Sequence, residues 1–595
     1  MVPFLDLIAR VGIIHPTYLF IWIMKSLLKI YQSHKKALLV LFATWALYFF
    51  LIFIRMIAYE PDGLYVGHKN VWGDWALHIG MVSIFAYKDP QYWFAYHPVY
   101  AGGKLTYPFL VNFISGMLVR VGFSMEMAFI IPSLIYVFFL LTGMYAVFYI
   151  VLKSKKQTLV AIFIFFLSAG LGFINFLRDF SNNPSLKMLL YPEQEYSNAI
   201  PYEVYSGNFV VGMLIPQRAF LLGMALSLWI MTGLVYILLN RKQAIGNRRI
   251  LFVLGTLAGL LPIIHIHSFI VIIVVTGSLC LISYERWKEL LFYAVPAIII
   301  SIFLYLMFIS GGIENPQFFQ WLPGWTSTGG LIGWLKMWIQ LWGIMLPIAV
   351  FGFFLLRKQP LIIKTFFFSF FLLFILANFF LFQPMRFDNT KIFMWAYLGF
   401  SGLAAVTLSW GWRRGGRTFS RFDVVLMAIV LTFTGSLELI RLQRIDRNQV
   451  QLASAEDIKL GAEIREKTDP LAIFLTSTNH NHPVMMWGAR SILMGYPGWV
   501  FTYGFLYQQR EKDVAVMFKG GAEAEKLLKQ YKISYVAIGP SELKNLQANE
   551  SYYAQNYPVA IQNQNYRIYD VRKLGLNSNG EQQLNARGKD WRGNY

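Results

Sequence analysis

Long apolar runs separated by short polar gaps occupy most of the first 440 residues of the chain. A helix needs about 20 apolar residues to cross the hydrocarbon core of a bilayer, and eleven runs meet or approach that length. They cover residues 37–57, 127–152, 157–177, 209–239, 250–264, 267–283, 290–310, 331–356, 361–384, 391–410 and 422–440. The pattern therefore predicts a polytopic α-helical membrane protein with about 11 transmembrane helices within residues 37–440.

Three stretches depart from this regular pattern. The two short runs on either side of His265 could be half-helices. Residues 108–122 form a short apolar segment that we interpret as re-entrant or interfacial. Residues 1–36 begin with an apolar stretch that carries scattered basic residues, but no small-residue cleavage site follows it. We therefore expect a cytoplasmic or interfacial N-terminal segment.

After residue 440 the pattern changes to that of a soluble α/β domain. The predicted elements are a helix at 455–468, a strand at 471–477, a helix at 526–533, a strand at 535–541 and a strand pair within 553–572. We place this C-terminal domain at residues 441–575 and a polar tail at 576–595. Cys280 is the one cysteine in the sequence, so no disulfide can form within the chain.

Composition and charge support the division into a membrane part and a soluble domain, and the basic residues indicate how the chain is oriented in the membrane. Apolar residues make up 56% of the 595 positions and charged residues 14%, which excludes an ordinary cytosolic enzyme. The net charge of +21 comes from short basic clusters between apolar runs, such as 153–156, 241–249 and 413–421, so we expect no nucleic-acid partner. Basic residues mark cytoplasmic loops. The N-terminus is then cytoplasmic and the C-terminal domain extracytoplasmic, in a multi-pass protein of the cell membrane.

The two long outer loops, 58–107 and 178–208, are rich in Tyr, Trp, Pro and carboxylates. We therefore expect the functional site at the outer face of the membrane. In the first loop, GDWALHIG (73–80) places Asp74 and His78 four residues apart. On a helix they share one face, so an acid and an imidazole would point into one cavity. The alternative is that Asp74 is only a helix cap and His78 an interfacial hydrogen-bonder.

The stretch HPVYAGGKLTYPF (97–109) follows in the same loop. It combines glycines with His97, Lys104 and Tyr107, which suits a segment that contacts a ligand and equally suits a well-packed turn.

Cations near the outer ends of the spans form a second candidate site. Arg218 opens a long apolar run, and QPMRFDNTK places Arg386, Asp388 and Lys391 between two others. Ionisable residues at membrane depth are costly and usually functional or paired, and arginine binds phosphate through two parallel hydrogen bonds. These cations are candidates for holding a phosphate. The alternative is an Arg386–Asp388 pair, or cations that reach to the membrane surface.

Two histidine pairs complete the candidates. His265 and His267 cannot bind one metal from a regular helix, whereas His480 and His482 could do so from an extended loop, although no firm third ligand accompanies them. The aromatic stretch 479–499, which includes Arg490, is either a sugar-stacking surface or the face that docks on the membrane domain. We expect both histidine pairs and Arg490 to contact substrate.

The span arrangement and the acidic residue after the first span resemble the GT-C superfamily of membrane glycosyltransferases. That superfamily includes oligosaccharyltransferase catalytic subunits, protein O-mannosyltransferases and aminoarabinose transferases. GDWALHIG, LTYPFLVNF, HIHSF, DNTK and NHNHPV with MGYPGW more closely resemble uncharacterised bacterial multi-pass proteins. The resemblance implies that Asp74 acts as base or metal ligand, that the donor sugar is carried on a polyprenyl phosphate, and that an outer cation holds this phosphate. Two departures are Trp75 where a second acid is expected and the absence of a WWDYG motif.

We therefore expect a GT-C-like glycosyltransferase that moves a sugar from a polyprenyl-phosphate donor in the bilayer to an extracytoplasmic glycan, lipid or protein. Asp74 and His78 are the expected catalytic residues, and Arg218, Arg386 and Lys391 are expected to bind the donor phosphate. No cofactor is expected, with a divalent metal as the alternative. The alternative function is a lipid-linked glycan transporter or a non-catalytic subunit of an envelope polysaccharide assembly system, with a partner membrane subunit.

Overall fold

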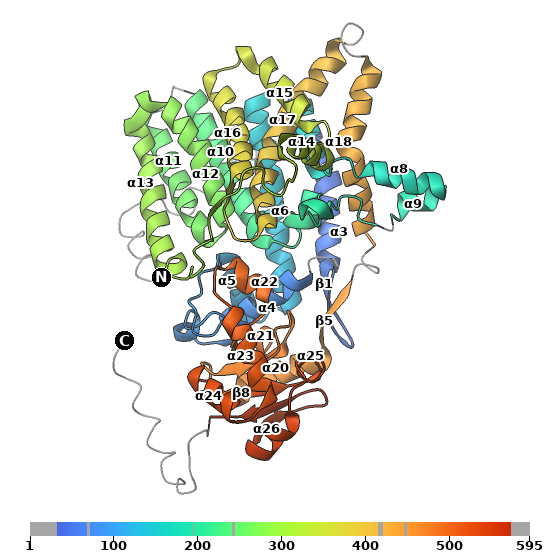
Figure 1. The fold of residues 1–595 in the computed structure, drawn as a ribbon. Helices are drawn as coiled ribbons and strands as arrows, with labels where there is room; N and C mark the ends of the chain where they lie inside the picture. Colours follow the sequence, from blue (N-terminus) through green and yellow to red (C-terminus); the bar gives the residue numbers. More distant parts are fainter. Residues whose placement is uncertain are drawn as a thin grey trace.

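The computed structural model describes residues 33–67, 72–192, 194–240, 244–414, 420–444 and 449–572, without the side chains of 244–246. Figure 1 shows a bundle of helices above a smaller α/β part that the end of the chain forms. The expectations for most of the N-terminal segment and for the polar tail lie outside the described residues.

Seven helical segments of the described chain are long and apolar enough to cross a membrane. They contain α3 (Leu47–Met56), α6 (Met125–Leu152), α10 (Arg218–Leu239), α13 (Trp287–Leu304), α16 (Leu361–Phe379), α17 (Thr390–Arg414) and α18 (Arg421–Leu442). An eighth candidate is the pair α14 (Gly330–Trp342) and α15 (Met345–Leu355), which bends by 85° at its break. The polytopic helical architecture is thus confirmed at seven to eight candidate spans.

The other predicted runs are occupied by shorter helices. They are α7 (Lys155–Phe166), α11 (Ala244–Leu260) and α12 (Ile266–Ile282). A 3₁₀ turn at Leu261–Ile263 separates α11 from α12, and His265 caps α12, so the two runs around it are separate helices. The segment 108–122 forms α5 (Leu110–Arg120), which packs on α4 (Trp72–Tyr87). Eleven crossings remain a prediction.

The C-terminal part contains a five-stranded mixed sheet in the order β7-β6-β8-β10-β9. Its strands are β6 (Ile473–Leu475), β7 (Ser491–Ile492), β8 (Tyr535–Ile538), β9 (Val559–Gln562) and β10 (Arg567–Asp570). Its main helices are α20 (Ala455–Lys467), α23 (Gln508–Lys519), α24 (Ala522–Gln530) and α26 (Glu550–Asn556). A capping box between Ser454 and Asp457 starts α20. Of these elements, α20, β6 and β8 lie within the helix and strands predicted at 455–468, 471–477 and 535–541, and α24 overlaps the helix predicted at 526–533. The pair β9 and β10 lies within the strand pair predicted at 553–572, whereas β7, α23 and α26 were not predicted.

The two parts of the chain are joined by shared backbone structure. β5 (Val450–Ser454) completes an antiparallel sheet with β1 (Ile57–Glu60) and β2 (Gly63–Val66) of the first long loop. The amide of Ile492 donates to Pro98 O, and that of Gly495 donates to Val99 O. The aromatic stretch 479–499 therefore docks on the first long loop, and its role in binding sugar stays a prediction.

Candidate active site

Six separate segments bring ionisable side chains into one group at the boundary between the helical bundle and the C-terminal part. Its members are Asp74, His78, Tyr107, Arg218, His265, His267, Asp388, Lys391 and Tyr503, and we call this group the polar cluster. Asp74 is within electrostatic range of Lys391 and Asp388, and Lys391 is within range of both histidines. The sequence predicts all of these residues except Tyr503 as site residues, and the fold brings them together.

Asp74 lies in the first turn of α4, and its side chain is partly exposed. Burial raises the pKa of its carboxyl to about 6, while Lys391 lowers this pKa and Asp388 raises it. The neighbouring Gly73 is in close contact with the C-terminal part, because a Cβ there would lie 2.6 Å from Cδ2 of His480. A carboxyl group with a pKa near 6 is ionised at neutral pH and still accepts a proton readily.

His78 is buried one helical turn further along α4. Burial, followed by the charge of Arg218, lowers the pKa of its imidazole to about 3, so His78 is neutral at pH 7. Its Nδ1 atom has no hydrogen-bond partner among the described residues. A neutral imidazole in this position can orient a neighbour by hydrogen bonding but carries no charge toward a substrate.

Arg218 is 1% exposed, and no carboxylate of the described chain lies within ion-pair distance of it. Its guanidinium donates to Ser115 Oγ at 2.7 Å and to Asn112 Oδ1 at 3.2 Å, and it stacks over the Phe129 ring at 3.7 Å. Its Nε has no hydrogen-bond partner among the residues that the structure describes. A buried cation that only neutral groups solvate is costly. The site is therefore electrostatically prepared for an anion.

The turn before α17 supplies a second charged group. Lys391 Nζ lies 2.6 Å from Asp388 Oδ1, whereas Asp388 Oδ2 is buried and has no hydrogen-bond partner in the described part of the chain. Arg386 contacts Glu203 at 3.2 Å in a half-exposed pair. The alternative Arg386–Asp388 pair is therefore not formed. Arg386 lies at the rim of the site, with Lys391 inside it.

The histidines at the start of α12 face the same region. His265 Nδ1 accepts from Ser268 N, while the Nε2 atoms of His265 and His267 are buried and unpartnered in the described structure. The described residues contain no group of three His, Cys, Asp or Glu side chains that could hold a metal ion. Asp388 forms an ion pair with Lys391.

The remaining predicted residues lie outside the polar cluster. His97 is buried against Tyr503, and Lys104 donates to Ser310 O at an exposed position. His480 stacks on Tyr496 and contacts Trp72, at the start of the Asp74 helix.

His482 and Arg490 lie inside the C-terminal part. His482 Nε2 is 3.3 Å from Glu542, and Arg490 donates to Thr468 and to backbone carbonyls. His480 and His482 thus face different partners.

Two polar contributors were not among the predicted site residues. Asn112 accepts a hydrogen bond from Arg218, and its position inside a short apolar segment was the available signal. Tyr503 comes from the C-terminal part and packs on Tyr107 with ring centroids 5.2 Å apart. Nothing in the local sequence around Tyr503 indicates this contact.

No known family profile matches the sequence, and no curated protein matches it significantly. Among solved structures it is similar to the oligosaccharyltransferase of Archaeoglobus fulgidus in complex with Zn and sulfate, with 11% identity, a TM-score of 0.47, and coverage of 86% of this chain and 69% of that one. It is also similar to ArnT from Cupriavidus metallidurans bound to undecaprenyl phosphate, with 12% identity, a TM-score of 0.46, and coverage of 90% and 98%. Both likenesses extend over most of this chain, at low sequence identity.

Proposed function

We propose that the protein is a membrane glycosyltransferase that moves a sugar from a polyprenyl-phosphate donor to an acceptor outside the cytoplasm. The observation that carries the proposal is the composition of the polar cluster. Asp74, with a pKa of about 6, lies in the same group as Lys391 and as Arg218, a buried cation without a carboxylate partner. A base near neutral pH beside cations is the combination that transfer from a phosphate leaving group requires.

In the proposed reaction an acceptor hydroxyl or amine attacks the anomeric carbon of the donor sugar. The new bond forms as the bond between that carbon and the phosphate oxygen breaks, so the leaving group is the polyprenyl phosphate. The acceptor proton passes to the carboxylate of Asp74. Neutral His78 orients Asp74 or the sugar by hydrogen bonding.

The cations act on the leaving phosphate, whose negative charge increases as the bond breaks. Lys391 is partly neutralised by Asp388, whereas Arg218 has only neutral partners and a free Nε. The unpartnered Nε2 atoms of His265 and His267 supply further hydrogen bonds on the same side. Arg386, at the rim, guides the phosphate toward these groups.

The side of the membrane follows from the basic clusters. We place the N-terminus in the cytoplasm and the C-terminal part outside, with eleven crossings between them. Acceptors are then envelope glycans, lipids or proteins, and the aromatic side chains that dock the C-terminal part border their entry, with His97, Lys104 and His480 nearby.

The test is release of free polyprenyl phosphate. Purified protein is reconstituted with radiolabelled polyprenyl-phosphate sugars and an envelope acceptor extract. Asp74→Asn keeps the shape of the side chain but removes its basicity, so transfer should fall by about 10²-fold or more while donor binding persists. Asp89→Asn, an exposed carboxylate of the same loop, is the matched control and should transfer normally.

Equal release by wild type and Asp74→Asn would remove Asp74 as the base. A wild type that binds the donor and moves it across the bilayer without releasing polyprenyl phosphate would instead support the transporter function.

A further inference from the structure

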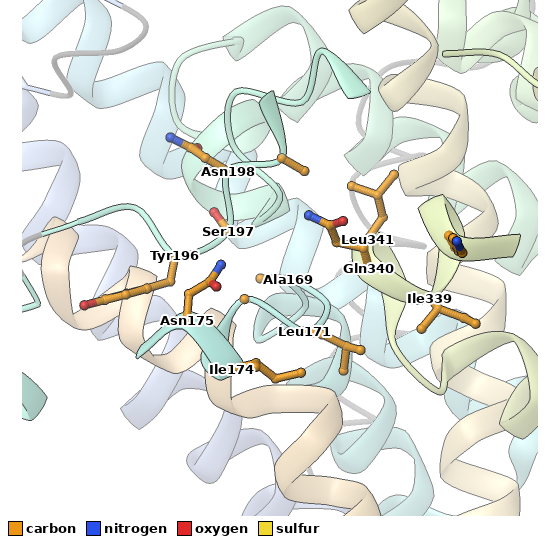
Figure 2. Close-up of a pocket in the computed structure, with 13 residues that line it drawn as sticks. Ala169, Leu171, Ile174, Asn175, Tyr196, Ser197, Asn198, Ile339, Gln340 and Leu341 are labelled. Carbon is orange, nitrogen blue, oxygen red and sulfur yellow. The ribbon is translucent and has the colours of Figure 1, made fainter. Parts of the chain in front are cut away.

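A cavity of about 380 Å³ lies on the flank of the bundle and shares no residue with the polar cluster. Its walls are the start of α8 (Phe173–Asn182), the loop at 196–199 and the end of α14 (Figure 2). Figure 1 shows α8 and the following α9 (Leu186–Leu190) projecting from the side of the bundle.

Most of the polar side chains in this cavity can donate hydrogen bonds; among the described residues Asn198 adds a buried Oδ1 acceptor that has no partner. Figure 2 shows the side chains of Asn175, Ser197 and Gln340 directed toward the same space, and Lys336 also lines it. The Asn175 carbonyl accepts from Arg178 and Ser197 Oγ accepts from Gly207 N, which leaves the amide and hydroxyl hydrogens available.

Lys336 and Gln340 form no side-chain hydrogen bond or ion pair in the described part of the chain, and neither Asp nor Glu is among the lining residues. The cavity thus offers several donors, one positive charge and one acceptor, which suits an anionic group that also carries a hydroxyl.

The surroundings of these donors are apolar and exposed. Ile174 and Ile339 line the cavity and are each 54% exposed. On α14, Leu331, Leu335 and Ile339 form one exposed stripe at helical spacing, while Trp338 and Trp342 of the other face are buried. In a chain with seven candidate spans, such a stripe is expected to face lipid tails.

We infer that this cavity binds the phosphate headgroup of an anionic membrane phospholipid, whose acyl chains lie along Ile174 and the α14 stripe. The volume lies at the small end for ligand sites and suits a headgroup. The non-bridging phosphate oxygens accept from Gln340, Asn175 and Ser197. Lys336 gives preference to a lipid with net negative charge over a zwitterionic one. The inference does not depend on the proposed transferase activity.

The experiment measures lipid binding to the full chain. Purified protein is delipidated in detergent and titrated with phosphatidylglycerol or phosphatidylcholine, and bound lipid is counted by native mass spectrometry. The wild type should bind one phosphatidylglycerol with at least about tenfold preference. Lys336→Ala should lose about tenfold or more in affinity, as expected for a charge-assisted hydrogen bond. Lys358→Ala, an exposed lysine near the end of α15, is the control and should bind like the wild type.

Gln340→Glu keeps the side-chain volume but adds a carboxylate, so it should bind still more weakly at unchanged melting temperature. Equal affinity of the wild type for the two lipids would overturn the inference, as would normal phosphatidylglycerol binding by both cavity variants. A parallel titration with undecaprenyl phosphate separates the lipid sources. If the cavity variants lose only undecaprenyl phosphate, the cavity belongs to the polyprenyl donor and the inference is wrong.

Discussion

The pH dependence of transfer tests the proposed role of Asp74 quantitatively. The ordinary pKa of its side chain is 3.8, and burial raises it to about 6. At 1.36 kcal/mol per pKa unit, this difference corresponds to about 3 kcal/mol against the ionised form. If the ionised form is the base, about nine tenths of the protein is active at pH 7 and about one tenth at pH 5. Transfer should therefore fall about tenfold over this interval.

Three histidines in this region stay neutral over that interval. Burial lowers the pKa values of His78 and His97 to about 3 and that of His480 to about 4, so these side chains remain neutral. Asp388→Asn provides the perturbation, because it removes a charge that raises the pKa of Asp74 and releases Lys391, which lowers it. The acid limb of the pH–rate profile, where transfer falls with decreasing pH, should then move to lower pH.

The assay measures initial rates of polyprenyl phosphate release at subsaturating donor between pH 5 and 8. Stability gives an independent reading. A raised folded-state pKa favours the folded protein below pH 3.8, and this contribution disappears as pH rises through 6. Asp74→Asn should therefore raise stability at pH 7 by up to about 3 kcal/mol while it lowers transfer by about 10²-fold or more. A flat rate between pH 5 and 7, or an acid limb that Asp388→Asn does not move, would refute the reasoning.

Four further outcomes are expected. Arg218→Gln should keep the melting temperature but weaken binding of a polyprenyl-phosphate sugar about tenfold or more; a large loss of stability with normal binding would make Arg218 structural. Arg386→Ala should change stability by less than about 1 kcal/mol, because its ion pair is half-exposed, and reduce donor affinity, with partial rescue by Arg386→Lys. Asn389→Ala should cost about 2–4 kcal/mol in thermal unfolding, since the buried amide bonds three backbone groups; an unchanged melting temperature contradicts this. A reporter fused after residue 445 should be extracytoplasmic and one within 241–249 cytoplasmic; the reverse would exclude the proposed orientation.

The local sequence determined the elements of this protein. Span positions follow from apolar length, because a helix in lipid must satisfy its backbone internally over a fixed thickness. Helical and strand periods in the C-terminal part likewise placed α20, β6, α24 and β8. The sequence also predicts that Asp74 and His78 share a helix face, because both lie on one helix, four residues apart.

Local patterns were less informative where element length or pairing depends on neighbours. The runs that became α7, α11 and α12 are interrupted by packing and turns, so apolar length alone does not give their helix lengths. The strand β5 pairs with β2, nearly 400 residues earlier in the chain, and the residue pattern of neither strand indicates this pairing.

Only the tertiary structure decided which charges meet. In the sequence Arg386 is two residues from Asp388 and Lys391 is three, but the fold pairs Lys391 with Asp388 and Arg386 with Glu203. Packing likewise leaves Arg218 without a carboxylate and raises the pKa of Asp74. Periodicity reports which face of one element is buried, whereas ion pairing and pKa depend on the distances and desolvation that several distant elements create together.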